Sequence, residues 1–524
     1  MKTYKLIKFG FVGLLTTFMF FGCTDDFEEL NTNDRVLTEL DAALIGNIFA
    51  RVQHRGMYSD SPQISQNLFG DHFAQYYSNT HPNFPSDRYE LVGGWLNGAW
   101  NQFYGNVANN LAVVLQGTDP VENPGFETFH AIAQIYRVIC YEHLANYWGP
   151  IPYSQVGNGE ASVPYDAQDT MYKSFFTTLD AALAILNSNS GGNAFGANDQ
   201  IYGGDVDKWI IFGNTIRLRI ALRISRVDPA LAKTQAETAV RDGVMELVSD
   251  DALFKPTVNS RNGMNRMVPW NEFRMSATME SVLKGYNDPR MPHFFRPTRE
   301  SSDPAFADYN GGPPFWKGMR NGYEVVDLAQ PQIQTDFVSP LGPRWDTVDK
   351  QSSNPHEHMQ SSEAYFARAE GAMNGWSMGG TAEELYNLGI TRSMEYWGID
   401  AGTIAAYIQS SATPTTTHDA PTPVSDVPVK FDAGRAMEQI MTQKWLAYFP
   451  NGWEAWAELR RTDLPAMYER MASQNPDVAK DEIMRRAQFV SGEYETNGSA
   501  VDAAVGILGG PDKGSTRLWW NPAP

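Results

Sequence analysis

Two short motifs have the residue types of a catalytic or a metal site. Residues 375–379 (GWSMG) match the G-x-S-x-G pattern of serine hydrolases, in which the serine follows a strand and precedes a helix. A helical pattern precedes this match, so we interpret it as a turn between two helices. His356, Glu357 and His358 place two histidines two residues apart, whereas zinc-protease histidines lie four apart on one helix face. We expect an exposed loop there, and neither motif predicts a catalytic residue or a bound metal.

A different chemistry is indicated at residues 71–97, where aromatic and polar side chains are mixed. Exposed aromatic rings stack on the apolar faces of sugars, while amide, carboxylate and guanidinium groups bind the hydroxyls. Binding residues commonly lie on loops that a rigid scaffold positions. The candidate ligand contacts in this segment are Asp71, Tyr76, Tyr77, Asn79, Phe84, Arg88, Trp95 and Asn97.

Composition limits the other classes of function. The 524-residue chain has a formal net charge of −20, which opposes binding to the phosphates of nucleic acids. Its two cysteines, Cys23 and Cys140, exclude a disulfide framework and a cysteine-based zinc site. No glycine-rich phosphate loop or EF-hand pattern occurs, so we expect no cofactor. Aromatic residues make up 12% of the chain, which suits both ligand stacking and a tryptophan-rich helical core.

Residues 1–22 have the organisation of a secretory signal peptide. Three lysines precede an apolar stretch from Phe9 to Gly22, which is too short for a transmembrane helix of about 20 residues. The stretch ends at Cys23, and a small residue followed by cysteine is typical of a bacterial lipobox. Cleavage there would leave Cys23 as an acylated N-terminus that anchors the chain in a membrane. The alternative is an ordinary signal peptide followed by an incidental cysteine.

Residues 23–35 are predicted to form a lipidated tether. This segment is acidic directly after the cysteine, at Asp25, Asp26, Glu28 and Glu29. Such residues resemble surface-export signals of Bacteroidetes-type lipoproteins, and the alternative is a solvated spacer.

Apolar residues that recur every three or four positions predict helices over most of the remaining chain. Short breakers separate consecutive helices, and large aromatic residues face small ones, as in tetratricopeptide repeats. The predicted fold class is all-α, a scaffold of about four tetratricopeptide-like helix pairs with large loop insertions. The predicted pairs are 95–116 with 126–148, 168–188 with 206–226, 361–374 with 381–397, and 433–449 with 451–462.

Two segments are predicted to be loops. Residues 289–355 are rich in proline, which fixes φ and removes a backbone donor. They also carry bulky aromatic residues, so we expect this block to be packed and ordered. Residues 410–428 contain no aromatic residue and are expected to be exposed. No clean linker occurs, so residues 36–524 are predicted to form one domain with a loop-rich insertion at 255–360.

Seven segments along the chain form an ordered set of motifs. They are 23–27 (CTDDF) with the following LNTN, 100–104 (WNQFY) leading to Asn110, 147–153 (YWGPIPY), 208–209 with 213–225, 287–290 (NDPR), 363–370 (EAYFARAE) and 443–465. Taken in this order, they resemble the SusD/RagB family of nutrient-binding outer-membrane lipoproteins. The resemblance implies an all-α fold with four tetratricopeptide-like helix pairs. It also implies a surface-exposed, lipid-anchored protein of the outer membrane that acts as the lid of a SusC-like TonB-dependent transporter.

The resemblance also locates further candidate residues. Ligand loops of this family lie before the first helix pair and in a central insertion, which correspond here to 71–97 and 264–345. From the second segment we select Trp270, Trp316, Arg344 and Trp345. The alternative for any one tryptophan is packing in the core.

Other aromatic and arginine residues are expected to stabilise the scaffold. Trp456 and Arg460 lie four residues apart on one predicted helix, which allows a cation–π contact. Arg217, Arg219 and Arg223 are expected to donate salt bridges between helices.

The predicted function is a non-enzymatic lipoprotein that captures a nutrient and passes it to its transporter. An oligosaccharide is the first expectation for the ligand, and a peptide or another nutrient is the alternative. A helical-repeat assembly protein without a small ligand is a second hypothesis. A surface glycosidase is the third, since its paired carboxylates are recognised only by their separation in space.

Overall fold

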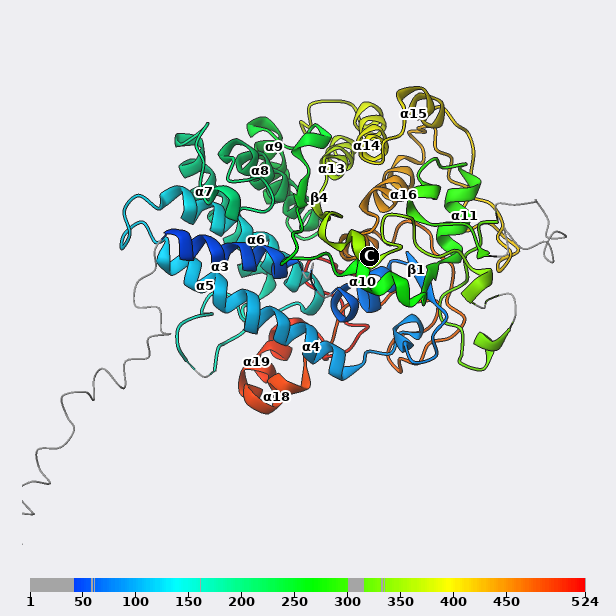
Figure 1. Cartoon of the computed structure of the whole chain (residues 1–524), viewed down its shortest axis with the longest axis horizontal. Coiled ribbons are helices and arrows are strands. Elements are labelled where there is room, and N and C mark those ends of the chain that lie inside the picture. Colours follow the sequence, from blue (N-terminus) through cyan, green and yellow to red (C-terminus); the bar gives the residue numbers. More distant parts are fainter. Residues whose placement is uncertain are drawn as a thin grey trace, which may run out of the picture. The chain divides into compact units, whose positions relative to one another are not determined.

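A computed structural model describes residues 42–57, 60, 62–160, 162–299, 315–330, 333 and 335–523. The predicted signal peptide, Cys23 and the tether lie outside these residues. The chain from Ile45 to Pro524 forms one compact unit, and helices make up most of its regular structure (Figure 1). No described helix is long and apolar enough to cross a membrane.

Helices dominate both halves of this unit. The α-helices of the first half are α3 (Ala42–Gly56), α4 (Gly93–Phe103), α5 (Asn109–Gly117), α6 (Glu127–Trp148), α7 (Gln168–Ser188), α8 (Val206–Arg223) and α9 (Pro229–Asp242). Those of the second half are α10 (Met264–Met267), α11 (Ala277–Gly285), α12 (Met291–Phe294), α13 (Ser361–Met373), α14 (Ala382–Tyr396), α15 (Ala401–Ile408), α16 (Ala436–Tyr448), α17 (Gly452–Thr462), α18 (Ser491–Thr496) and α19 (Gly498–Leu508).

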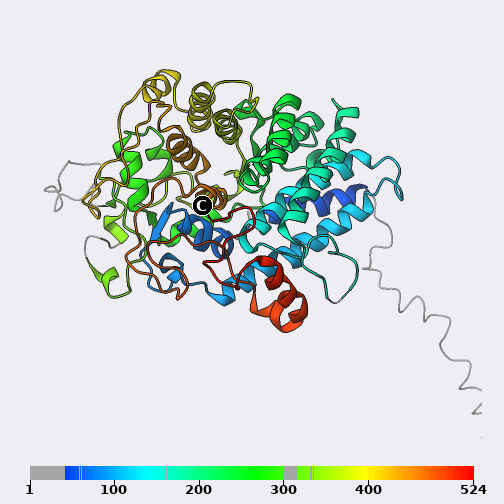
Figure 2. The same cartoon turned by 180° about the vertical axis from the view of Figure 1, so that it is seen from behind.

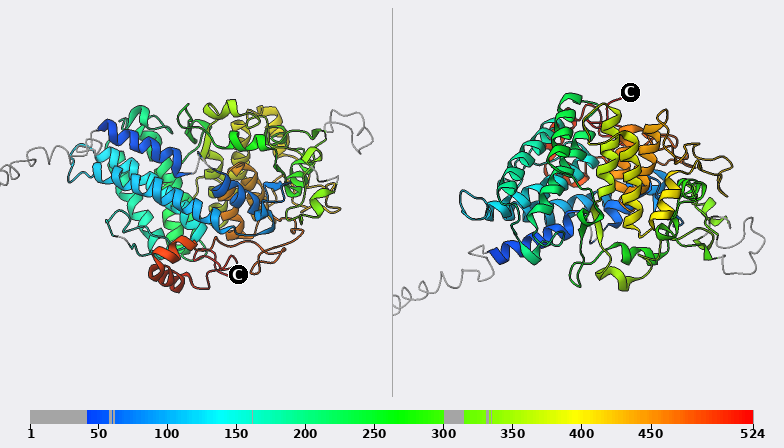
Figure 3. Two further views of the ribbon diagram at one scale, coloured as in Figure 1. Left: turned by 60° about the horizontal axis from the view of Figure 1, so that its bottom comes forward. Right: turned by 90° about the horizontal axis from the view of Figure 1, so that it is seen from above.

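The predicted helix pairs are confirmed. Helix α6 packs against α5 on one side and α7 on the other, and α8 packs against α7 and α9. Helix α13 packs against α14 and α16, and α16 packs against α17. Figure 3 shows these helices running side by side in both halves, and Figure 2 shows the C-terminal helices from behind, where α18 lies against α4. The structure adds α9, which the periodicity did not predict, and a π-helix, η3 (Tyr104–Ala108), that interrupts the first predicted helix.

Short strands and turns form the rest. Strand β1 (Tyr77–Asn79) pairs antiparallel with β3 (Phe273–Met275), and β2 (Ala252–Phe254) pairs antiparallel with β4 (His356–Met359). A second π-helix, η1 (Gln63–Asp71), lies against α17. Residues 410–428 contain no helix or strand, as predicted, but only eight of these nineteen residues are exposed, and Pro414, Ala420 and Val427 are buried.

The core contains most of the aromatic excess. Trp209 and Trp456 are fully buried, and Trp100, Trp397 and Trp445 are nearly so. Cys140 is a buried free thiol on α6. The Arg460 guanidinium lies 3.6 Å from the Trp456 ring centroid, which confirms the predicted scaffold contact.

Buried ion pairs link the helices of both halves. Arg219 on α8 donates to both carboxylate oxygens of Glu363 on α13, at 2.6 and 2.7 Å. Arg223, one turn further on, donates to Glu454 of α17 at 2.5 Å. Arg461 of α17 donates to both oxygens of Glu370 at 2.6 Å. Burying a charge is costly unless a partner compensates it, so these pairs fix how the helices pack.

Arg217 completes the predicted set. Its guanidinium pairs with Asp180 of α7, so all three arginines of α8 connect helices as expected.

Removing Arg219 should lower the free energy of unfolding by about 3–5 kcal/mol, because Glu363 would keep a buried and uncompensated charge. Denaturant unfolding of Arg219→Ala measures this loss. The matched control is Lys173→Ala, which removes an exposed cation 3.7 Å from Asp169 and should leave the midpoint almost unchanged. Equal midpoints for the two variants would contradict a structural role for the buried pair.

Candidate ligand-binding face

The structure joins the two segments that were predicted to bind ligand. Strand β1 belongs to the first segment and β3 to the second, and Asn79 lies opposite Phe273 in their register. Isolated bridges between Arg274 and Pro340 and between Ser276 and Met319 bring in the proline-rich block. Parts of 71–97 and 264–345 therefore lie side by side in one region of the fold, although about 190 residues separate the two strands in sequence.

Aromatic rings cluster where these strands end. The Phe84 ring stacks on Phe273 with centroids 5.9 Å apart and planes at 9°. The Trp95 ring meets Phe84 edge-on, at 6.1 Å and 69°, and the His81 ring centroid lies 5.0 Å from that of Phe84. Phe273 is buried, whereas the other three rings are half-buried. They can therefore offer part of their surface to a ligand.

Trp270 and Glu272 extend this surface. Trp270 is 44% exposed, which is more than any other tryptophan in the described residues. Glu272 lies two residues later, and its carboxylate is 3.6 Å from His81 Nε2. We call His81, Phe84, Trp95, Trp270 and Glu272 the aromatic face. It combines rings for stacking with polar side chains that can bind hydroxyls.

His81 and Glu272 were not among the predicted ligand residues. His81 lies within the segment 71–97, and Glu272 follows Trp270. The signal for both was proximity to selected aromatic residues, but their pairing depends on the contact between β1 and β3.

Six of the predicted residues are buried instead. In the first segment, the Tyr76 hydroxyl donates to the Trp445 carbonyl, and the Arg88 guanidinium donates to Tyr323 O at 3.2 Å and Pro82 O at 3.0 Å. These side chains position the loop, and a ligand cannot reach them in this conformation. The buried residues are Asp71, Tyr76, Tyr77, Asn79, Arg88 and Trp345.

The second segment divides in the same way. Trp345 is fully buried, and its ring meets Phe449 edge-on with centroids 5.7 Å apart. Arg344 is mostly buried, pairs with Glu357 at 2.5 Å and donates to the Tyr396 hydroxyl at 2.9 Å. Trp316 is half-buried against the core. These positions correspond to the packed, ordered loop block that was expected there.

Asn97 lies on the first turns of α4 and bridges to the C-terminal helices. Its Nδ2 donates to Ser491 Oγ at 2.7 Å, and its Oδ1 accepts from Gly492 N at 3.0 Å. Both ends of the amide are thus already occupied within the protein.

Asp71 shows what the buried polar residues do. Its carboxylate accepts hydrogen bonds from Gly452 N at 2.9 Å and Asn67 Nδ2 at 2.7 Å. Burial raises the pKa of this carboxyl to about 7, against the effect of those donors. Asp71 therefore connects η1 to the start of α17.

The prediction of an exposed loop at 356–358 is wrong. These residues form β4, and all three side chains are buried. His358 Nε2 lies 3.1 Å from the Tyr136 hydroxyl, and Glu357 pairs with Arg344. Pairing with β2 explains the difference, since a histidine in a strand can be buried when its ring packs on aromatic neighbours. No group of three or more metal-ligating side chains occurs in the described part of the chain.

The G-x-S-x-G match is a turn between helices, as predicted. Residues 375–379 connect α13 to α14, so the strand that a nucleophile elbow requires is not there. Ser377 is exposed, and its backbone N–H donates to Glu237.

The arrangement of paired helices defines a protein of tetratricopeptide-like class. Comparison with protein families identifies which one: the SusD-like model, described as "Susd and RagB outer membrane lipoprotein", matches residues 28–521. The chain belongs to this family and is an outer-membrane lipoprotein. Members of the family bind nutrients without catalysis. A search of curated proteins found no match.

Solved structures agree with this assignment. A chitin-binding SusD homolog from Flavobacterium johnsoniae is 32% identical, with a TM-score of 0.82 over 92% of this chain and 99% of that one. A SusD-like protein from Bacteroides thetaiotaomicron is 31% identical, with a TM-score of 0.79 over 92% and 99% of the two chains. A SusD homolog from Bacteroides uniformis is 28% identical, with a TM-score of 0.80 over 92% and 100%.

Asp71→Ala separates a scaffold role from ligand contact. The variant should lower the free energy of unfolding by about 1–3 kcal/mol, because it leaves buried donors of Gly452 and Asn67 without an acceptor. Its affinity for any ligand of the aromatic face should remain that of the parent protein. Denaturant unfolding measures the stability, and calorimetric titration measures the affinity. A loss of affinity without a loss of stability would indicate that Asp71 contacts the ligand.

Acid sensitivity should depend on His356. Burial lowers its pKa from 6.5 to about 4, so between these values the unfolded chain binds a proton that the folded chain does not. Stability therefore falls as the pH drops from 6.5 to 4, by up to about 1.4 kcal/mol per pH unit from this group. Unfolding curves of His356→Phe across this range should show a shallower decline. Buried carboxyls with a raised pKa have the opposite effect on the pH dependence of stability, but they are the same in the parent and in His356→Phe and so cancel in the comparison. Parallel plots of stability against pH for the two proteins would contradict this role of His356.

Proposed function

We propose that this lipoprotein binds an oligosaccharide at the aromatic face and delivers it to a SusC-like TonB-dependent transporter. The observation that supports this proposal best is the cluster of partly exposed rings next to the paired strands β1 and β3. Phe84, Trp95 and Trp270 offer ring surface, and His81 and Glu272 offer polar atoms beside it. This is the combination that neutral sugars require, because each ring has an apolar face and a hydroxyl edge.

The relatives support a glycan as the ligand class. The Flavobacterium johnsoniae homolog is described as chitin-binding, and a further structure that is 26% identical, with a TM-score of 0.76, is described as a chitin-binding protein. We infer a glycan for this chain from the aromatic face together with those two relatives. A peptide or another nutrient is the alternative ligand, because aromatic and carboxylate groups also bind peptides.

Family membership supports the proposed partner and the proposed position on the cell. An acyl group on Cys23 would hold the protein at the outer membrane, and an acidic tether would let the body reach a surface-exposed position over the barrel. Delivery needs no covalent step, since stacking and hydrogen bonds of modest strength allow release. Assembly without a small ligand remains the competing function, and it requires no role for the aromatic face.

Calorimetric titration of the detergent-purified protein with hexasaccharides of chitin, cellulose and starch tests the proposal. At least one glycan should bind, and Trp95→Ala and Trp270→Ala should each weaken it about tenfold, because each removes a stacking surface worth about 1.4 kcal/mol. Trp376→Ala is the matched control, since this half-buried tryptophan lies on the turn between α13 and α14.

Unchanged glycan affinity in both variants would contradict the aromatic face as the site. Binding of a peptide mixture, but of no glycan, would favour the alternative ligand. Co-purification with a TonB-dependent barrel and no ligand affinity would favour the assembly function.

A further inference from the structure

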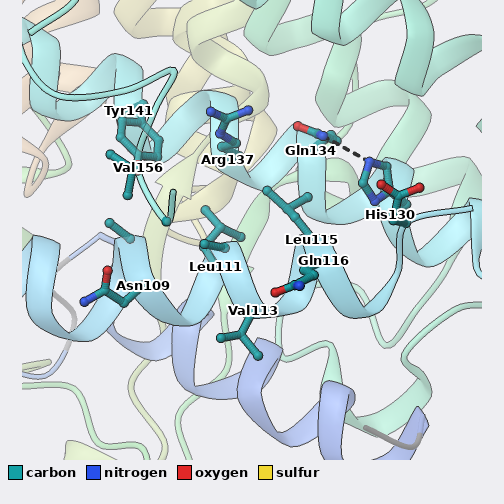
Figure 4. A pocket seen from close by; sticks show the side chains of 14 residues that line it. Asn109, Leu111, Val113, Leu115, Gln116, His130, Gln134, Arg137, Tyr141 and Val156 are labelled. Atoms are coloured by element: carbon teal, nitrogen blue, oxygen red, sulfur yellow. Dashed lines mark hydrogen bonds between the residues drawn. The ribbon is translucent and has the colours of Figure 1, made fainter. Parts of the chain in front are cut away.

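A pocket lies between α5 and α6, in a part of the chain that contributes nothing to the aromatic face (Figure 4). Its volume is about 660 Å³, within the range of pockets that hold small molecules. The loop after α6 covers one end, where Gly157 approaches Ala112 so closely that an added Cβ would lie 2.9 Å from the Ala112 Cβ. Gly157 also has φ of +88°, which favours glycine.

One stripe of α6 forms a polar wall of this pocket. His130, Gln134, Arg137 and Tyr141 follow each other at steps of four, three and four residues, so they share a helix face. Helix α5 supplies the facing wall, with Leu111 and Leu115 as apolar surface and with Asn109 and Gln116 as exposed amides. Figure 4 shows these side chains lining the space between the two helices.

Arg137 is the side chain of this pocket that is best suited to bind an anion. Its guanidinium carbon lies 4.2 Å from the Tyr153 ring centroid, and Nη2 donates to Tyr153 O at 3.2 Å. These contacts hold the half-buried side chain in place, yet no carboxylate in the described residues forms a salt bridge with it. Its planar guanidinium therefore has N–H donors available for an anion from outside the protein.

The neighbouring groups add no second positive charge. Burial lowers the pKa of His130, and its ring nitrogens lie 3.2 Å from Thr118 Oγ1 and 3.0 Å from Gln134 Nε2. Asp119, at one end of the pocket, accepts from Val121 N at 2.9 Å. Gln134 Oε1 is buried and has no hydrogen-bond partner in the described part of the chain, so the exposed amides of α5 are the groups that a ligand hydroxyl can reach.

We propose that this pocket binds a small hydroxylated carboxylic acid of the size of one or two sugar rings, such as a hexuronic acid. Arg137 would bind the carboxylate through two parallel hydrogen bonds. Gln116 and Asn109 would bind hydroxyl groups, while Leu111 and Leu115 would contact the carbon skeleton. This site does not depend on the proposed function, because it shares no residue with the aromatic face.

Ligand-observed NMR titration of the detergent-purified protein with D-glucuronate and D-glucose tests the site. Glucuronate should bind, and glucose should bind at least tenfold more weakly, since it lacks the carboxylate. Arg137→Gln should weaken glucuronate at least tenfold and abolish the preference, whereas Arg137→Lys should retain part of it as a point charge. Arg241→Gln is the matched control, because it removes an exposed cation whose side chain is 68% accessible.

A variant that fills the pocket keeps the proposal testable even if the arginine variants misfold. Gln116→Trp adds bulk at an exposed wall position, so it should abolish glucuronate binding while the thermal unfolding curve is preserved. Three results would each overturn the proposal. The first is equal affinity for the two sugars, and the second is full glucuronate binding in Arg137→Gln and Gln116→Trp. The third is no binding of glucuronate at 10 mM, a concentration that detects affinities down to about the millimolar range. Oligosaccharide titration of Arg137→Gln should match the parent protein, so failure at this pocket and failure at the aromatic face are distinguishable.

Discussion

Arg219 and Arg223, one turn apart on α8, are held inside the protein by carboxylates from α6, α13 and α17. Glu458 extends this network, because it forms ion pairs with Arg223, with Arg461 and with Lys444 of α16. A buried charge without a partner costs several kcal/mol, so the helices can pack only in the register that brings these groups together. Apolar packing alone would tolerate a sliding of one helix along another, and the charges remove that freedom.

The binding loops depend on this scaffold through a small number of buried connections. Trp445 on α16 donates from Nε1 to Ala74 O at 2.9 Å and accepts from the Tyr76 hydroxyl. Asp71 connects η1 to the start of α17, where a Cβ on Gly70 would lie 2.9 Å from Gly452 O. The helices that carry the charge network therefore also hold the segment from which β1 and the aromatic face extend.

Periodicity predicted the long helices because burial on one face leaves a repeat of three to four residues. Helix α9 lacked that signal, since its buried residues are Ala232, Ala236 and Ala239, which contrast weakly with polar neighbours. The π-helices η1 and η3 were also beyond prediction, because an extra residue per turn depends on tertiary contacts. The strand pairing of β1 with β3 joins distant segments, and no local pattern specifies it.

The candidate site was predicted as a region but not residue by residue. Loops that bind sugars and loops that pack onto a scaffold both need aromatic rings and hydrogen-bonding side chains, so composition cannot separate them. Tyr76 and Trp270 illustrate this, because one is fully buried and the other is 44% exposed. What divides them is whether α16 covers the ring, and that follows from the helix packing.

The same reasoning applies to Arg137 and Arg219. Both are arginines on helices that face other helices. Among the residues that the structure describes, Arg219 meets carboxylates from other helices and Arg137 meets none, so the Arg137 donors face an open pocket. At physiological salt the charge of the whole chain is screened beyond about 8 Å, so the local partners of each arginine, and not the net charge, decide which one can bind an anion.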